Sequence, residues 1–103
     1  AKALKESELW DLAIPTPRHW AGTWHLVVFD IPVKKSRTRI SFIRLLQNLG
    51  LQFYQRSVWI YPHPVRETVE KVARSYGITP YVSFITATEI DGATALKKRF
   101  NIT

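Results

Sequence analysis

The sequence predicts an α+β domain with a ferredoxin-like fold, in which an antiparallel sheet carries two helices on one face. The main observation is the order of the segments, which reads strand, helix, strand, strand, helix, strand along the chain. The length of 103 residues fits a single domain with one core. Hydrophobic residues make up 46% of the chain, which excludes a disordered tail.

The predicted strands are short and rich in β-branched and aromatic residues. The segment 24–31 (WHLVVFDI) is a continuous apolar run, as is typical of a central strand covered on both faces. Pro32 ends this strand because proline lacks a backbone donor. Further strand-like segments lie at 51–56, 57–61 and 81–90, and a direct junction or a tight bend joins the first two.

The predicted helices have apolar stripes at helical spacing. The first covers 35–49, where one face holds Phe42, Leu45, Leu46 and Leu49, and Gly50 is suited to end it. The second covers 65–76 and ends at Gly77. A short C-terminal helix is expected after Asp91, whose side chain can cap it. Its last turn carries three cations that favour the negative end of the helix dipole: Lys97, Lys98 and Arg99.

The prolines near the N-terminus divide the chain into two parts. We expect residues 1–23 to form an arm or linker and residues 24–103 to form the ferredoxin-like domain. Pro15 and Pro17 break a helix, although residues 4–12 can form a short one. Two tryptophans in this arm, Trp10 and Trp20, favour packing of the arm against the body.

The composition excludes several classes of protein. The chain has no cysteine, so disulfides and thiolate metal sites are excluded. No apolar run approaches the ~20 residues that a membrane span needs, and the N-terminus lacks the apolar core of a signal peptide. We therefore expect a cytoplasmic protein without a membrane partner. The absence of methionine predicts a fragment of a longer chain, or one that has lost its first residues.

The charge of the chain predicts a polyanionic partner. The net charge is +7, and no carboxylate lies between Asp30 and Glu67. The candidate nucleic-acid-binding residues fall in this stretch, which also contains Arg56: Lys34, Lys35, Arg37, Arg39 and Arg44. Concentrated positive charge attracts DNA or RNA, and arginine binds phosphate with two hydrogen bonds. The alternative is that these side chains are solvated, with Arg39 packed at a helix end.

Several short motifs, in order, resemble a known family. They are LVVFDI at 26–31, KKSRTR at 34–39, LGL at 49–51 and SVWI at 57–60. Together they resemble the small CRISPR-associated adaptor and endoribonuclease family, the second of the Cas proteins. The closer resemblance is to the Cas-like domain of PaaX-type repressors of phenylacetate catabolism. The matching residues are Trp20, Gly22, Trp24, Phe29, Asp30, Ile31, Pro32, Ile90, Asp91 and Gly92.

The resemblance implies a role for Asp30 as a catalytic and metal-binding residue. In a homodimer, one Asp30 from each protomer would hold Mg²⁺, whose hard oxygen ligands are commonly carboxylates. Such an ion could activate water against a phosphodiester, which would make the protein a metal-dependent endonuclease. The alternative is that the Asp30 side chain caps the turn before Pro32.

The second face of the predicted sheet also carries large apolar residues and needs a cover. Self-association is the simplest solution, so we expect a homodimer. On the segment 57–61, Ser57, Trp59 and Tyr61 alternate; packing in a core or interface is favoured over stacking on bases.

Three functions follow. The first is a homodimeric, nucleic-acid-associated domain of a PaaX-like transcriptional regulator with an N-terminal winged-helix domain. The second is a CRISPR spacer-acquisition adaptor that binds an integrase subunit, with or without Mg²⁺-dependent endonuclease activity. The third is a protein-interaction and dimerisation domain without catalysis.

Overall fold

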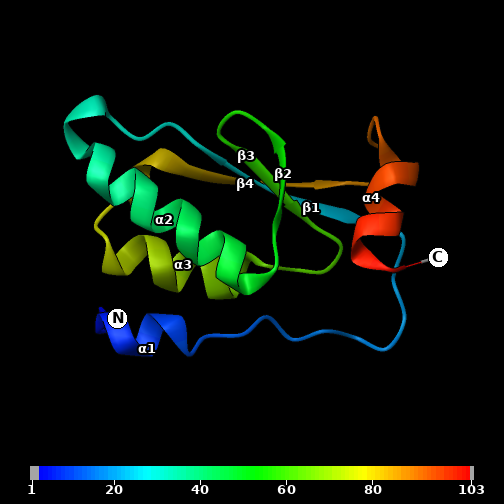
Figure 1. The fold of residues 1–103 in the computed structure, drawn as a ribbon, viewed down its shortest axis with the longest axis horizontal. Helices are drawn as coiled ribbons and strands as arrows, with labels where there is room; N and C mark the ends of the chain where they lie inside the picture. Colours follow the sequence, from blue (N-terminus) through cyan, green and yellow to red (C-terminus); the bar gives the residue numbers. More distant parts are fainter. Residues whose placement is uncertain (1–2, 103) are drawn as a thin grey trace.

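One antiparallel sheet forms the centre of the computed structural model, which describes residues 3–102 (Figure 1). Its strands lie in the order β2-β3-β1-β4. Their bounds are β1 Trp24–Phe29, β2 Gln52–Gln55, β3 Val58–Tyr61 and β4 Val82–Ala87. Helices α2 (Ser36–Leu49) and α3 (Arg66–Ser75) each connect two strands that have a third strand between them. The predicted α+β, ferredoxin-like fold is therefore confirmed.

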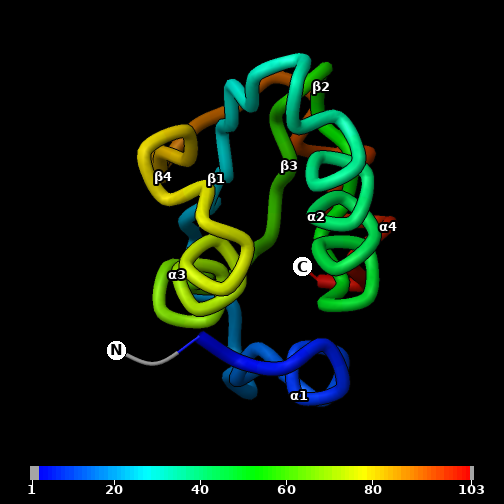
Figure 2. Tube along the Cα trace, turned by 90° about the vertical axis from the view of Figure 1, so that its left-hand side faces the viewer, coloured from blue at the N-terminus to red at the C-terminus, as the bar shows by residue number. Residues whose placement is uncertain are grey.

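The main core lies between the sheet and the helices α2 and α3, which run side by side (Figures 1 and 2). Phe42 of α2 is fully buried and meets Phe29 of β1 edge to face, with ring centroids 5.2 Å apart. The predicted stripe on α2 is confirmed, because Phe42, Leu45, Leu46 and Leu49 are all buried. Trp59 of β3 is buried in the same core, which confirms the packing role favoured for this residue.

The opposite face of the sheet has a second apolar cluster. Trp24, Leu26 and Ile60 point to this face and pack with Leu96 of α4 (Ala93–Phe100). The Trp20 ring packs against the same cluster, with its centroid 5.0 Å from that of the Trp24 ring. The chain thus covers much of the face that was expected to need a second copy. Ile85 of β4, on the same face as its neighbour Leu26, stays 49% exposed.

The N-terminal arm packs beneath α2 and α3, on the side away from the sheet (Figures 1 and 2). Its helix α1 (Glu6–Trp10) is shorter than the predicted 4–12. Leu9 and Ile14 are buried in the main core, and the Leu4 amide donates to Ser75 Oγ at 2.8 Å. Packing of the arm therefore depends on aliphatic residues as well as on Trp20.

Several boundaries differ from those predicted, for local reasons. A 3₁₀ turn, η1 (Val33–Lys35), precedes α2, and a second, η2 (Thr79–Tyr81), delays the start of β4. Ser57 adopts φ 64° in the turn between β2 and β3, so it lies outside the strand in which it was expected. Gly50 ends α2 at φ 101°, as predicted.

The predicted cap of the C-terminal helix is wrong. Gly92, at φ 77°, occupies the N-cap position of α4, and no side chain caps that end. Asp91 lies one residue too early, and its backbone carbonyl accepts a hydrogen bond from the Tyr54 hydroxyl at 3.0 Å. The turn therefore holds Asp91 through its backbone.

No helix within residues 3–102 combines the length and the apolar character needed to cross a lipid bilayer.

Candidate nucleic-acid interface

Asp30 lies at one end of the sheet, immediately after β1. The Phe29 amide donates to the Ser57 carbonyl at 3.0 Å, and the Asp30 amide donates to the Tyr81 carbonyl at 2.9 Å. The neighbouring strands thus fix the backbone on both sides of this residue. The Asp30 side chain is exposed. A turn cap would need the Asp30 carboxylate to accept from a backbone amide, and no such hydrogen bond is found among the described residues.

Four of the predicted basic residues lie along η1 and α2, where three of them are exposed and Lys35 is half-buried. Lys34 and Lys35 lie in η1, and Arg37 lies in the first turn of α2. Arg44 follows seven residues later, which is about two helical turns or about 10 Å along the axis. Arg37 and Arg44 therefore project from the same face of α2, and both are exposed. We call these four residues the α2 cationic surface.

The Arg39 side chain does not belong to the α2 cationic surface and has a structural role. Its guanidinium donates to Ser57 Oγ at 3.1 Å and lies 5.5 Å from the centroid of the Phe29 ring. These interactions link α2 to the β2–β3 turn and to the end of β1. This matches the alternative that Arg39 packs at a helix end.

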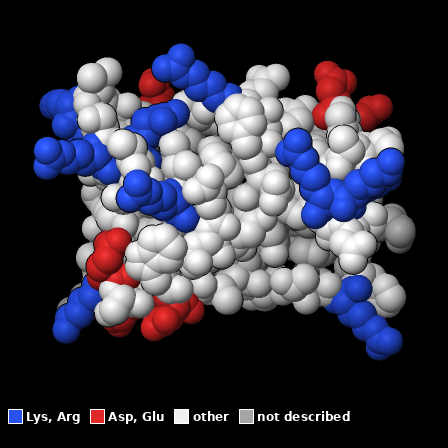
Figure 3. All heavy atoms as spheres, viewed as in Figure 1, with Lys and Arg blue, Asp and Glu red and all other residues white. Residues whose placement is uncertain are grey.

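The charge of the α2 cationic surface is not neutralised within the described residues. Across residues 3–102 one ion pair is formed, between Arg66 and Glu70 of α3. The first turn of α2 has no acidic residue and no side-chain cap, so the positive end of its dipole adds to the field. Figure 3 shows Lys and Arg side chains gathered over the end where α2 begins, with a second group around α4.

Three residues at this end were not predicted from the sequence as part of the site. Val33 is 91% exposed and Ile40 is 50% exposed, so aliphatic side chains lie among the cations. Arg56 is exposed in the β2–β3 turn beside Ser57. A signal for Ile40 was present, because it falls off the buried stripe of its helix. Arg56 could have been selected from its place in the carboxylate-free stretch.

Asp30 of a single chain is not part of a cluster of metal-ligating side chains among the described residues. Among the described residues, no three His, Asp or Glu side chains come close enough to hold a metal ion. Mg²⁺ is commonly held by one or two carboxylates with water completing its shell, so a single chain supplies the smaller of these numbers. The arrangement with one Asp30 from each of two protomers stays a prediction.

The fold and the cationic end together define a ferredoxin-like domain with a positively charged surface at the start of α2. A family model described as the PaaX protein central Cas2-like domain matches residues 17–98. The chain belongs to this family. The match begins within the predicted arm, so it includes Trp20, which helps to cover the second face of the sheet. No curated protein and no solved structure matched the chain.

Proposed function

We propose that this chain is a nucleic-acid-associated domain of a PaaX-like transcriptional regulator and acts as a homodimer. The observation that carries the proposal is the α2 cationic surface, in a stretch without carboxylates. Lys34, Arg37 and Arg44 are exposed there, and Lys35 is half-buried. Arginine and lysine at such a surface contact phosphates, which gives affinity with little sequence preference. Specific DNA sequences would then be recognised by a separate DNA-binding domain. We propose that this domain is the N-terminal winged helix expected from the resemblance.

The proposed homodimer would use the part of the open sheet face that α4 leaves uncovered. Ile85 is half-exposed there, and Val28 and Val58 are partly buried on the same side. Pairing two copies through such a patch would bring two cationic surfaces into one assembly. A paired surface would increase the number of phosphates held at once, and so the affinity.

A salt titration of duplex DNA binding tests the proposal. We expect the affinity of the 103-residue chain to fall steeply between about 50 and about 200 mM salt, because bound phosphates release counterions. The double variant Lys34→Ala/Lys35→Ala should reduce the slope of log affinity against log salt by about 0.9 for each phosphate that the variant no longer binds. The matched control is Lys98→Ala/Arg99→Ala, which removes the same charge from α4 at the other end of the molecule.

The comparison of the two double variants decides the outcome. Equal weakening by both pairs would mean that net charge alone attracts the DNA. An affinity that does not change with salt would exclude phosphate binding, and with it the proposed function.

A second candidate function is a Mg²⁺-dependent endonuclease, and the position of Asp30 favours it. This carboxylate is exposed at the sheet end from which the α2 cationic surface begins, where a phosphodiester would be held. The test is cleavage of RNA and DNA with and without Mg²⁺. Cleavage that needs Mg²⁺ and disappears in Asp30→Ala would support this function. Cleavage that persists in Asp30→Ala would exclude Asp30 as its origin.

A further inference from the structure

Strand β4 forms an open edge of the sheet. It pairs with β1 on one side, and in Figure 2 no described segment lies beyond it on the other. Its six residues, VSFITA, include no charge, proline or glycine. The register with β1 runs without a break from Trp24↔Ala87 to Phe29↔Val82. A regular, uncharged edge of this kind presents free backbone donors and acceptors to an added strand.

The other edge of the sheet is protected. Strand β2 has four residues, and its pairing with β3 is interrupted between Phe53 and Gln55. Short length and a bulge are two of the devices by which proteins prevent an edge from pairing. The contrast makes β4 the edge that is suited to a partner.

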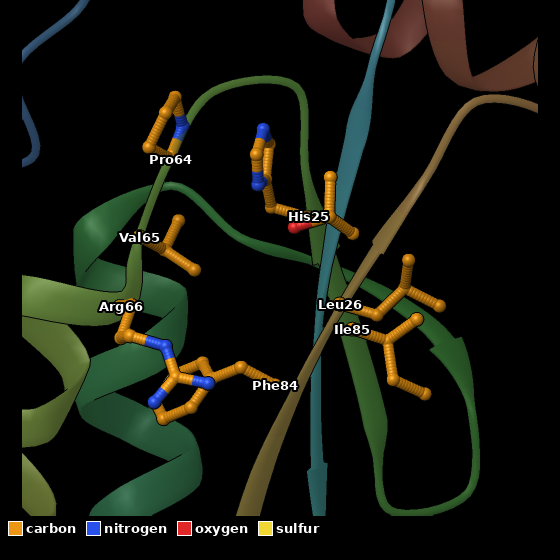
Figure 4. A pocket seen from close by; sticks show the side chains of 8 residues that line it. His25, Leu26, Pro64, Val65, Arg66, Phe84 and Ile85 are labelled. Carbon is orange, nitrogen blue, oxygen red and sulfur yellow. The ribbon is translucent and has the colours of Figure 1, made fainter.

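Two hollows lie between β4 and α3, one after the other along the strand. The first has a volume of about 260 Å³ and is bordered by residues 84–86; Figure 4 shows its lining. The second has a volume of about 380 Å³ and is bordered by residues 82–84. Both are lined by Arg66 and Phe84, whose guanidinium carbon and ring centroid are 4.7 Å apart. This stacked pair therefore separates the two hollows.

The register of β4 sets which side chains of an added strand would meet these features. Phe84 pairs with Val27, whose side chain lies in the main core, so Val82, Phe84 and Thr86 face the helices. Residues two apart on an added strand also share one face and lie about 7 Å apart. Three successive side chains on that face would reach the second hollow, the Arg66–Phe84 pair and the first hollow.

The residues that line each hollow indicate which side chain of an added strand would fit into it. The first hollow is bordered by the apolar residues Pro64, Val65 and Phe84, whereas the Leu26 and Ile85 side chains point to the opposite face of the sheet. Burial and the nearby His63 lower the pKa of His25 below 6.5, so this wall is uncharged at neutral pH. A branched aliphatic side chain fits there. The second hollow has polar residues in its lining, Glu70 and Thr79 among them, which suit a small polar side chain.

At the central position of the added strand, which faces the Arg66–Phe84 pair, a carboxylate is favoured. Arg66 is paired with Glu70 at 2.9 Å, but the Arg66 side chain is 66% exposed, and exposed pairs of this kind contribute little. Its guanidinium can therefore turn to an incoming acid at small cost. Pairing of two β4 strands about Phe84 would instead bring two Arg66 side chains together. This repulsion disfavours a second copy of the chain as the occupant.

We propose that the β4 edge binds an extended acidic peptide segment of a partner protein as a fifth strand. In this segment a central Glu or Asp meets Arg66. An aliphatic residue and a hydroxyl residue, each two positions away, occupy the two hollows. This mode of recognition uses backbone hydrogen bonds for affinity and alternate side chains for specificity.

The test uses an acetylated synthetic peptide of sequence STTETVS, titrated into the ¹⁵N-labelled 103-residue chain. We expect amide shift changes along Val82–Ala87 and at the start of α3, and none along Gln52–Gln55. A matched peptide, N-methylated at alternate residues, keeps the side chains but loses backbone donors, and it should not bind. Equal binding of the N-methylated peptide, or the same shifts at β2, would overturn the proposal.

A charge exchange tests the central interaction. Arg66→Glu should weaken binding of STTETVS about fivefold, and the peptide STTKTVS should recover that loss on the variant. Arg66 is exposed, so the variant should fold normally. No recovery would exclude the proposed pairing with Arg66. Shifts at Val82–Ala87 that depend on protein concentration alone would identify a second copy as the occupant and overturn the proposal. DNA binding measured on the same variant is independent of both results.

Discussion

Two arginines in the first turns of α2 have different structural environments. Arg39 turns inward to Ser57 and Phe29, whereas Arg37 points to solvent with its charge free to act outside the molecule. They are two residues apart, which places them on different sides of a helix. The backbone position alone therefore decides which of these cations supports the fold.

We predict that Arg39→Ala lowers the free energy of unfolding by about 1–2 kcal/mol, because it removes a charged hydrogen bond and a cation–π interaction. The matched change Arg37→Ala should alter it by less than about 0.5 kcal/mol. Urea denaturation measures both. DNA affinity should respond mainly to Arg37→Ala. A larger stability loss for Arg37→Ala would contradict the assignment.

Gly50 gives a second prediction for a single residue. It holds φ 101°, and a Cβ there would lie 3.2 Å from Cε1 of Tyr61. Gly50→Ala should therefore cost about 1–2 kcal/mol, from backbone strain together with the close approach to the ring. Gly77, at φ 67° with open space around it, is the control for strain alone. Thermal unfolding should show the larger loss at Gly50, and equal losses would remove any role for Tyr61.

At the scale of elements, helix α4 acts as the cover of the second sheet face. Leu96 is 5% exposed and packs with Trp24, Leu26 and Ile60. We predict that Leu96→Ala lowers the free energy of unfolding by about 2–4 kcal/mol, as expected for a large apolar side chain removed from a core. The exposed neighbour Thr94→Ala is the control and should change it little. A small effect of Leu96→Ala would mean that α4 is only loosely attached.

The attachment of α1 to the end of α3 should depend on pH. The Tyr76 hydroxyl donates to Glu6 at 3.2 Å, and burial, together with the Glu6 charge, raises the pKa of Tyr76 from 10.0 to about 12. Folding thus favours the neutral phenol. Its contribution to stability is complete below pH 10 and is lost as the pH rises towards 12.

The measurement is the difference in unfolding free energy between the native chain and Tyr76→Phe, from about pH 8 to about pH 11. We expect the difference to stay constant below pH 10, and the native chain to lose stability relative to the variant above pH 10. A constant difference would show that Glu6 does not hold the phenol in its neutral form.

At the scale of the whole molecule, the arm and the body share one core. Leu9 is 2% exposed and belongs to the same cluster as Val27 and Val69. We therefore predict that the arm unfolds with the domain in a single transition, and that Leu9→Ala costs about 2–4 kcal/mol overall. Hydrogen exchange of the Leu9 amide should then match that of Phe29. Faster exchange at Leu9, with no effect of Leu9→Ala on the main transition, would indicate an independent arm.

Periodic features of the sequence predicted the order of strands and helices because each buried face repeats locally. The stripe from Phe42 to Leu49 and the apolar run from 24 to 29 were sufficient for this. The cover provided by α4 could not be predicted, because Leu96 meets Trp24 only after the chain has folded back across the sheet. The partner of Arg39 lies eighteen residues away, in a turn that has no periodic signal.

The candidate surface was predictable in part, because its residues are close together in the sequence. Lys34, Arg37 and Arg44 are exposed and Lys35 is half-buried in a stretch without carboxylates, and sequence spacing is enough to find these residues. The free edge at β4 and its two hollows depend on strand order and on the approach of α3. Neither the free edge nor the hollows can be predicted from the residues of one segment alone.

Closure of the second sheet face by Trp20 and by α4 couples the two ends of the folded unit. A proteolytic cut that releases either segment would expose the rings and aliphatic chains of Trp24, Leu26 and Ile60 to water. Nicked molecules would then tend to associate through this face. Trimming at either end would thus change how molecules of this protein assemble, before it changed whether the sheet itself is formed.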